Sequence, residues 1–108
     1  MRLLLDTTRV RFTVTRAPEP RMDFGKDVQK VDRDTGRPQW TVEVLAMDTE
    51  RGEVIRVTVA GDEPKVRQGQ DVTFADLEAI AWTNNGKSGV AYKAAQIAPA
   101  PAQPAKAA

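Results

Sequence analysis

RVRFTVT, residues 9–15, decides the fold, because polar and apolar residues alternate along the whole stretch. A period of two residues is typical of a strand with one buried face. Val10, Phe12 and Val14 are therefore expected to face a core, and their polar neighbours to face solvent. The same periodicity recurs through most of the chain, so the sequence predicts an all-β protein.

Two further strands alternate in the same way downstream of this stretch. They are Trp40–Asp48 (WTVEVLAMD) and Val54–Ala60 (VIRVTVA). The residues between them, Thr49–Glu53 (TERGE), are expected to form a hairpin turn in which Gly52 takes a positive φ.

The C-terminal half of the chain supplies two more expected strands. Asp71–Trp82 is predicted to form one long, bent strand, because it has no helix cap and is too short for an amphipathic helix. A turn-rich loop at Thr83–Gly89 then leads into Val90–Ile97 (VAYKAAQI), the last predicted strand.

Five strands with short connections favour a five-stranded OB-fold-like small barrel, with an SH3-like barrel as the nearest rival. The long polar stretch Arg16–Gln39 would then be the loop, or loose hairpin, between strands 1 and 2. Residues 1–97 are expected to form a single domain. Residues 98–108 are rich in alanine and proline and are expected to form a flexible tail.

The residue types that are absent argue against catalysis. The chain has no histidine and no cysteine, and its single serine is Ser88. The commonest general base and metal ligand is therefore missing, and no thiol nucleophile is available. The glycines match neither a phosphate-binding loop nor a dinucleotide fingerprint. We expect a binding protein that is not an enzyme and that uses no cofactor, metal or small-molecule substrate.

Hydropathy indicates where the protein is expected to be located, and net charge indicates what kind of surface could bind nucleic acid. No apolar run approaches the roughly 20 residues of a membrane span, and Asp6 ends the short apolar cluster Leu3–Leu5. We therefore expect a cytoplasmic protein with no membrane association. The net charge is only +1, so nucleic-acid binding would require a local basic surface.

Basic and aromatic residues gather at two of the expected loops. In an OB-fold, ligands lie across strands 2 and 3, between the loop joining strands 1 and 2 and the loop joining strands 4 and 5. Cations bind phosphates and flat rings stack on exposed bases, which is the chemistry of single-stranded nucleic-acid binding. The candidate nucleic-acid-binding residues are Arg16, Arg21, Phe24, Lys26, Lys30, Arg33, Arg37, Trp40, Arg56, Trp82, Lys87 and Tyr92.

The same residues also suit less specific roles. Five acidic residues nearly balance the six basic residues of the long loop, which would equally fit a merely solvated loop. The sequence does not decide whether Trp82 and Tyr92 face the core or a ligand. The alternative function is a non-catalytic protein-interaction or regulatory module on a similar barrel. Open strand edges are also compatible with a homodimer.

Residues 35–40, TGRPQW, resemble a Gly-basic-Pro-aromatic stretch in the DNA-binding hairpin of the helix-destabilising proteins of filamentous phages, with one extra residue before Trp40. The segment from about Val28 to Ile97 looks closer to the small replication, integration and excision activator proteins of actinomycete plasmids and integrative elements. TGRPQW and Trp82, which precedes a glycine-containing turn, carry this likeness. The resemblance implies an OB-type barrel, single-stranded DNA binding, often a dimer, and Arg37 and Trp40 as binding residues.

Overall fold

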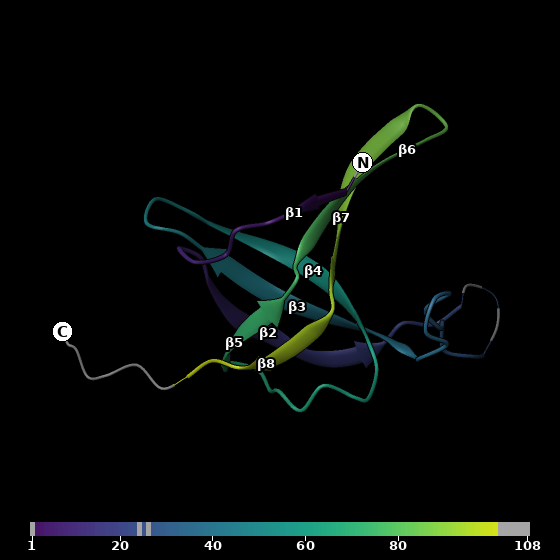
Figure 1. The fold of residues 1–108 in the computed structure, drawn as a ribbon, viewed down its shortest axis with the longest axis horizontal. Helices are drawn as coiled ribbons and strands as arrows, with labels where there is room; N and C mark the ends of the chain where they lie inside the picture. Colours follow the sequence, from purple (N-terminus) through teal and green to yellow (C-terminus); the bar gives the residue numbers. More distant parts are fainter. Residues whose placement is uncertain (1, 24, 26, 102–108) are drawn as a thin grey trace.

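The computed structural model describes residues 2–23, 25 and 27–101, and these residues form one sheet of eight strands without a helix (Figure 1). The strands are β1 (Arg2–Leu4), β2 (Arg11–Pro20), β3 (Gln39–Met47), β4 (Gly52–Ala60), β5 (Asp71–Ala75), β6 (Glu78–Asn84), β7 (Lys87–Ala94) and β8 (Gln96–Pro99). The predicted all-β class is confirmed. No helix in this part of the chain is long and apolar enough to cross a membrane.

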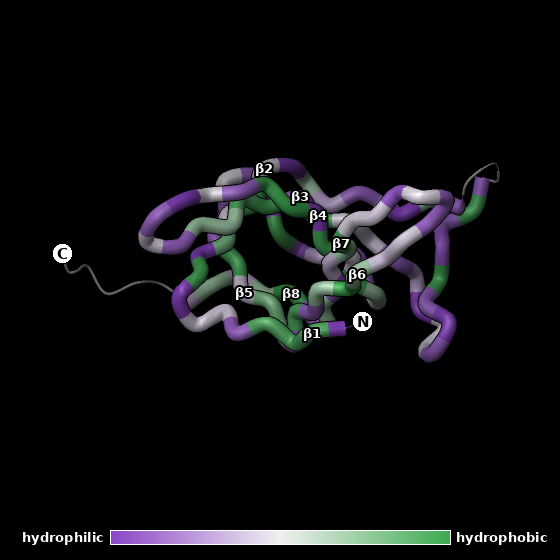
Figure 2. Tube along the Cα trace, turned by 90° about the horizontal axis from the view of Figure 1, so that it is seen from above, coloured by the Kyte–Doolittle hydropathy of each residue, from purple (hydrophilic) through white to green (hydrophobic). Residues whose placement is uncertain are grey.

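The order of the strands explains why the sheet curls. It runs β1-β6-β7-β4-β3-β2-β5-β8, with β4 and β7 parallel and every other neighbouring pair antiparallel. β5 pairs with β2, whereas β6 pairs with β7 on the other side of the sheet. Only Asp76 and Leu77 join β5 to β6, so the sheet must bend round to let the chain pass. Figure 2 shows the strands arranged around a common interior.

The core lies on the concave side of the curled sheet. Its buried side chains are Phe12, Val14, Val42, Val44, Val57, Val59, Val66, Val72, Phe74, Leu77 and Ala94. The rings of Phe12 and Phe74 meet edge to face, with centroids 5.0 Å apart and planes at 83°, a geometry that adds to the stabilisation from burial. The inward orientation predicted for Phe12 and Val14 is confirmed, and Val10 is half-buried at the margin of the core.

The number of strands differs from the five that the sequence predicts. The long bent strand expected at Asp71–Trp82 is divided, because Asp76 takes a φ of 54° and interrupts the ladder. The predicted strand Val90–Ile97 is also divided, because β7 ends at Ala94 and β8 begins at Gln96 and pairs with β5. Ala98 and Pro99, which were expected in the tail, belong to β8, and β1 is an additional edge strand. Strands of three or four residues are too short to display a period of two.

Two predicted turns are also corrected. The expected loop at Thr83–Gly89 is mostly strand, and the turn is confined to Asn85 and Gly86, which have φ values of 53° and 77°. Positive φ at both central residues is typical of a tight two-residue hairpin. Gly52 lies in β4 without a positive φ. A Cβ there would lie 3.0 Å from Met47 Cγ. The glycine is therefore explained by the lack of space for a side chain at this position.

The segment expected as a long loop is partly ordered as strand. β2 continues to Pro20 through register shifts between Val14 and Arg16 and between Arg16 and Glu19, which bend the strand as β-bulges do. Residues 21–38, which we call the β2–β3 loop, include isolated bridges that pair Met22 with Gln29 and Val31 with Pro38. The loop projects from the sheet, on the side of the molecule away from β5 (Figure 1).

Candidate nucleic-acid interface

The convex side of β3 and β4, which we call the outer face, carries the polar residues that alternate with the buried valines. The strand register places Glu43 opposite Arg56 and Thr41 opposite Thr58. The parallel pairing with β7 then places Lys93 beside Thr58. Arg56 and Thr58 alternate with the buried Val57 and Val59 of β4 and therefore lie on the outer face, which β7 extends.

A hollow of about 320 Å³ lies on the outer face beside the two bulges of β2, and we call it the β2–β4 hollow. It is lined by Arg16, Ala17, Glu19, Pro20, Met22, Thr41, Glu43 and Arg56. The structure thus brings two of the predicted site residues, Arg16 and Arg56, to one place. Met22, Thr41 and Glu43 were not among the residues predicted from the sequence. The alternation in β3 already placed Thr41 and Glu43 opposite the core, on the face that holds Arg56.

Charges of both signs meet in the β2–β4 hollow. Arg16 Nη2 lies 3.6 Å from Glu19 Oε2, and Arg56 Nε lies 3.4 Å from Glu43 Oε2. Thr15 Oγ1 donates a hydrogen bond of 2.8 Å to Glu43 Oε1. This hydrogen bond, followed by that from Arg56, holds the pKa of Glu43 below its ordinary value. The hollow therefore offers both fixed donors and a fixed, ionised acceptor.

Arg21 and Lys30 come together where the β2–β3 loop leaves the sheet. The Lys30 amide donates to the Arg21 carbonyl at 2.7 Å, and the Arg21 amide donates to the Gln39 carbonyl at 3.0 Å. The Arg21 guanidinium turns onto the outer face, where Nη1 donates to Thr58 Oγ1 at 2.8 Å. Arg21 therefore lies on the same face as Arg56, whereas Lys30 is half-buried at the base of the loop.

A buried ion pair fixes the end of the β2–β3 loop against β7. Lys93 Nζ lies 2.8 Å from Asp32 Oδ1, and Asp32 is 6% exposed. Its second oxygen accepts hydrogen bonds from the amides of Asp34 and Thr35 and from the Thr35 hydroxyl. The ammonium of Lys93 is the main cause that holds the pKa of Asp32 below its ordinary value. Arg33 is exposed on the turn that this network holds.

Arg37 and Trp40 lie at the end of β3, close to Gly61. Trp40 Nε1 donates to the Gly61 carbonyl at 3.0 Å, and the exposed Arg37 lies over the same residue, since a Cβ on Gly61 would be 3.3 Å from Arg37 Cζ. Trp40 pairs with Val59 and shares the concave side with the core. Its half-buried indole is therefore on the side of the sheet opposite to the β2–β4 hollow.

The β6–β7 hairpin carries the second predicted tryptophan on an exposed surface. Trp82 is 45% exposed. Its indole lies over Gly89, where an added Cβ would come within 2.6 Å of Trp82 Cζ2. The register pairs Trp82 with Gly89 and Asn84 with Lys87, so these four residues share one side of the hairpin. The hairpin and the β2–β3 loop both project on the side of the molecule away from β5 (Figures 1 and 2).

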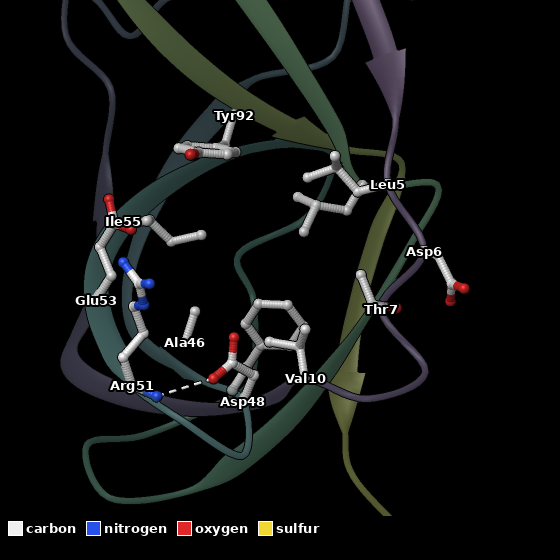
Figure 3. Close-up of a pocket in the computed structure, with 12 residues that line it drawn as sticks. Leu5, Asp6, Thr7, Val10, Ala46, Asp48, Arg51, Glu53, Ile55 and Tyr92 are labelled. Carbon is white, nitrogen blue, oxygen red and sulfur yellow. Dashed lines mark hydrogen bonds between the residues drawn. The ribbon is translucent and has the colours of Figure 1, made fainter.

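Tyr92 lies away from these groups, half-buried on the concave side. Its ring helps to line a separate pocket of about 300 Å³, in which Asp48 and Arg51 lie near the edge (Figure 3). The apolar residues that line this pocket are Leu5, Val10, Phe12, Ala46, Ile55 and Leu77. We call it the concave pocket. It can accommodate an apolar group, but it is not continuous with the outer face.

The remaining predicted residues, Phe24 and Lys26, lie outside the described residues. Within residues 2–23, 25 and 27–101, no group of carboxylates is arranged to hold a metal ion. No protein-family model matches the chain, and neither the curated proteins nor the solved structures contain a match.

Proposed function

We propose that this protein binds single-stranded DNA without catalysing a reaction. The observation that carries the proposal is the exposed indole of Trp82, held over Gly89 on the side of a projecting hairpin that also bears Asn84 and Lys87. A ring in this position can stack on a base, an interaction worth roughly 1–3 kcal/mol per base. The sequence resemblance adds a role in the replication or maintenance of a plasmid or integrative element.

The connectivity supports an OB-type barrel as part of this proposal. β2, β3 and β4 form a meander, β4 is parallel to β7, and the bent β5–β6 segment pairs with both β2 and β7. Counting β5 and β6 as one bent strand gives the five strands of a small Greek-key barrel, with β1 and β8 as additions. The β2–β3 loop and the β6–β7 hairpin then occupy the positions that grip ligands in OB-folds.

The free cations support a path for the phosphate backbone. Within the described part of the chain, five predicted residues take part in no ion pair: Arg21, Lys30, Arg33, Arg37 and Lys87. All five belong to the β2–β3 loop or the tip of the β6–β7 hairpin. Four other exposed cations without an ion pair in the described residues, Arg9, Arg51, Lys65 and Arg67, lie outside these two segments. The proposed path is therefore a local basic surface, which is compatible with a net charge of +1.

Fluorescence anisotropy of a labelled oligothymidylate of 20 nucleotides, titrated at several salt concentrations, tests the proposal. Each phosphate that a cation neutralises contributes about −0.7 to the slope of log affinity against log salt for a single strand. Contacts from several of these cations therefore predict a slope of about −2 to −3.5. Unchanged anisotropy at low salt would overturn the proposal.

A pair of lysine variants provides the control. Lys87→Ala is expected to weaken binding and to reduce the salt slope by about 0.7, because it removes one phosphate contact. Lys65→Ala removes the same charge from the exposed connection between β4 and β5 and is expected to leave both unchanged. Equal effects from the two variants would show that only net charge matters and that no path exists.

The concave pocket favours a second candidate function, a protein-interaction module. Its apolar side chains surround a space of about 300 Å³ (Figure 3), which would accommodate an apolar side chain of a partner. An apolar dye whose emission rises on binding should report on the pocket, and Ala46→Phe, which fills it, should suppress the rise. This candidate would be preferred if the oligonucleotide titration fails and the dye signal depends on Ala46.

A further inference from the structure

The β2–β4 hollow differs from the rest of the proposed DNA path, because its cations have acidic partners. Arg16 faces Glu19 and Arg56 faces Glu43, so the lining carries two positive and two negative charges. A phosphate placed there would meet two carboxylates as well as two guanidinium groups. The hollow is therefore better suited to a neutral group with hydrogen-bond donors and acceptors than to the phosphate backbone.

Glu43 is the most enclosed of these four charged side chains. It is 19% exposed, compared with 69% for Arg56, 56% for Arg16 and 61% for Glu19. Thr15 holds one of its carboxylate oxygens and Arg56 approaches the other. A carboxylate has about four acceptor sites, so both oxygens keep capacity for a ligand. The result is a carboxylate fixed in direction and flanked by guanidinium donors.

The four DNA bases present different hydrogen-bonding edges to such a carboxylate. Guanine alone places two donors side by side, N1–H and the N2 amino group, and they match the two oxygens of a carboxylate. Its O6 and N7 are acceptors that arginine recognises well. Thymine offers one N–H between two carbonyl oxygens, which a carboxylate would repel. Adenine and cytosine each place a ring acceptor beside their amino group.

We propose that the β2–β4 hollow is a base subsite that prefers guanine, with Glu43 accepting hydrogen bonds from N1–H and N2–H and Arg56 or Arg16 donating to O6. This inference rests on the proposed single-stranded DNA binding. Met22 and Pro20, which also line the hollow, supply apolar surface for the face of the base. The volume of about 320 Å³ falls at the lower end of the range of roughly 300–1,000 Å³ typical of ligand pockets.

Oligothymidylates of 20 nucleotides with two separated guanines near the centre, compared with the same oligonucleotides carrying adenine or cytosine, test the preference. A good bidentate contact discriminates by about 1–3 kcal/mol, which corresponds to roughly 5- to 150-fold in affinity. We expect the guanine oligonucleotide to bind more tightly by a factor in this range. Replacing guanine by hypoxanthine, which lacks only the N2 amino group, should remove much of the gain.

Variants assign the preference to Glu43. Glu43→Gln keeps the shape of the side chain and an acceptor for Thr15, but it replaces one acceptor oxygen by a donor. It should bind all the oligonucleotides with nearly equal affinity. Glu53→Gln, on the same strand as Arg56 but lining the concave pocket, is the matched control and should keep the preference. If Glu43→Gln fails to fold, Arg56→Gln serves instead, and it should reduce the preference by removing a donor to O6.

The outcomes separate this inference from the proposed function. Equal wild-type affinity for the guanine, adenine and cytosine oligonucleotides, together with salt-dependent binding of oligothymidylate, would overturn guanine recognition and leave DNA binding intact. A preference that persists unchanged in Glu43→Gln would overturn the assignment to this hollow. No binding of any oligonucleotide at low salt would overturn both.

Discussion

The two tryptophans have different surroundings, and this difference separates a binding ring from a structural one. Trp40 is half-buried with its indole N–H bound to the Gly61 carbonyl, whereas Trp82 is 45% exposed on a projecting hairpin. The chain has only these two tryptophans. Each of them can therefore be observed alone after the other is replaced by phenylalanine.

We predict that oligothymidylate quenches the emission of Trp40→Phe, in which Trp82 is the only tryptophan, because a stacked base contacts this ring. Trp82→Phe should show little quenching, since Trp40 lies on the concave side of the sheet. Steady-state fluorescence titration measures both variants. Quenching of Trp40 alone would contradict the proposed position of the DNA.

Gly89 makes room for the indole of Trp82, which occupies the space that a side chain there would need. Gly89→Ala would place a Cβ within 2.6 Å of Trp82 Cζ2, so the ring must move. We expect a loss of oligonucleotide affinity of roughly 5- to 150-fold if the movement ends stacking. Ser88→Ala, on the other side of the same hairpin, is the control and should bind normally. Unchanged affinity in Gly89→Ala would show that the position of the ring is unimportant.

At the scale of elements, the Asp32–Lys93 pair holds the β2–β3 loop against β7. The folded structure lowers the pKa of Asp32, as it does those of Asp6, Glu43, Asp48 and Asp71. A carboxyl group whose pKa is lower in the folded state stabilises the fold at pH values above its unfolded-state pKa, which is about 4. This stabilisation is lost as the pH falls through the folded-state pKa.

Asp32→Asn is therefore expected to lower the urea midpoint at pH 7, where the wild-type carboxylate is charged and paired. The difference between the two proteins should shrink as the pH falls below about 4, because the wild-type carboxyl then takes up a proton. Urea unfolding at both pH values, followed by circular dichroism, measures the effect. A difference that grows on acidification would contradict the role assigned to the ion pair.

Alternation was sufficient to predict β3 and β4 to within two residues and the first half of β2, because each has one buried face and one polar face there. It did not predict the second half of β2, where two bulges interrupt the alternation. It failed for the loop predicted at Thr83–Gly89, because the β6–β7 hairpin extends beyond the core and both of its faces are exposed. The parallel pairing of β4 with β7 and the contact of Asp32 with Lys93 join residues far apart in the chain. No local pattern specifies such contacts.

The candidate site was predictable to a similar extent. Arg56 was placed on the outer face by alternation alone, and the same reasoning would have found Glu43. Arg16 joins them only because two bulges shift the register of β2, which the sequence does not reveal. Alternation places Trp40 on the same face as Val42 and Val44, and Tyr92 on the same face as Ala94, and the structure has both on the concave side of the curled sheet. Alternation does not show how far each ring is buried.

At the scale of the whole molecule, stability and binding should depend on different aromatic residues. Phe12 is 4% exposed and contacts Phe74 in the core, so Phe12→Ala is expected to lower the free energy of unfolding by about 3–5 kcal/mol. Trp82→Ala should change it by about 0.5 kcal/mol or less, as is usual at exposed positions. Urea denaturation compares the two. A large destabilisation by Trp82→Ala would mean that this ring is structural.

The projecting groups and the concave pocket lie on different sides of the curled sheet, so a ligand can be located by the residues that it perturbs. The most direct measurement is a two-dimensional NMR titration of ¹⁵N-labelled protein with oligothymidylate. We expect shifts at the Trp82 indole and at the amides of Lys87 and Arg21, with Ala46 and Leu77 in the concave pocket unaffected. Shifts confined to the concave pocket, or no shifts at low salt, would contradict the proposed DNA binding.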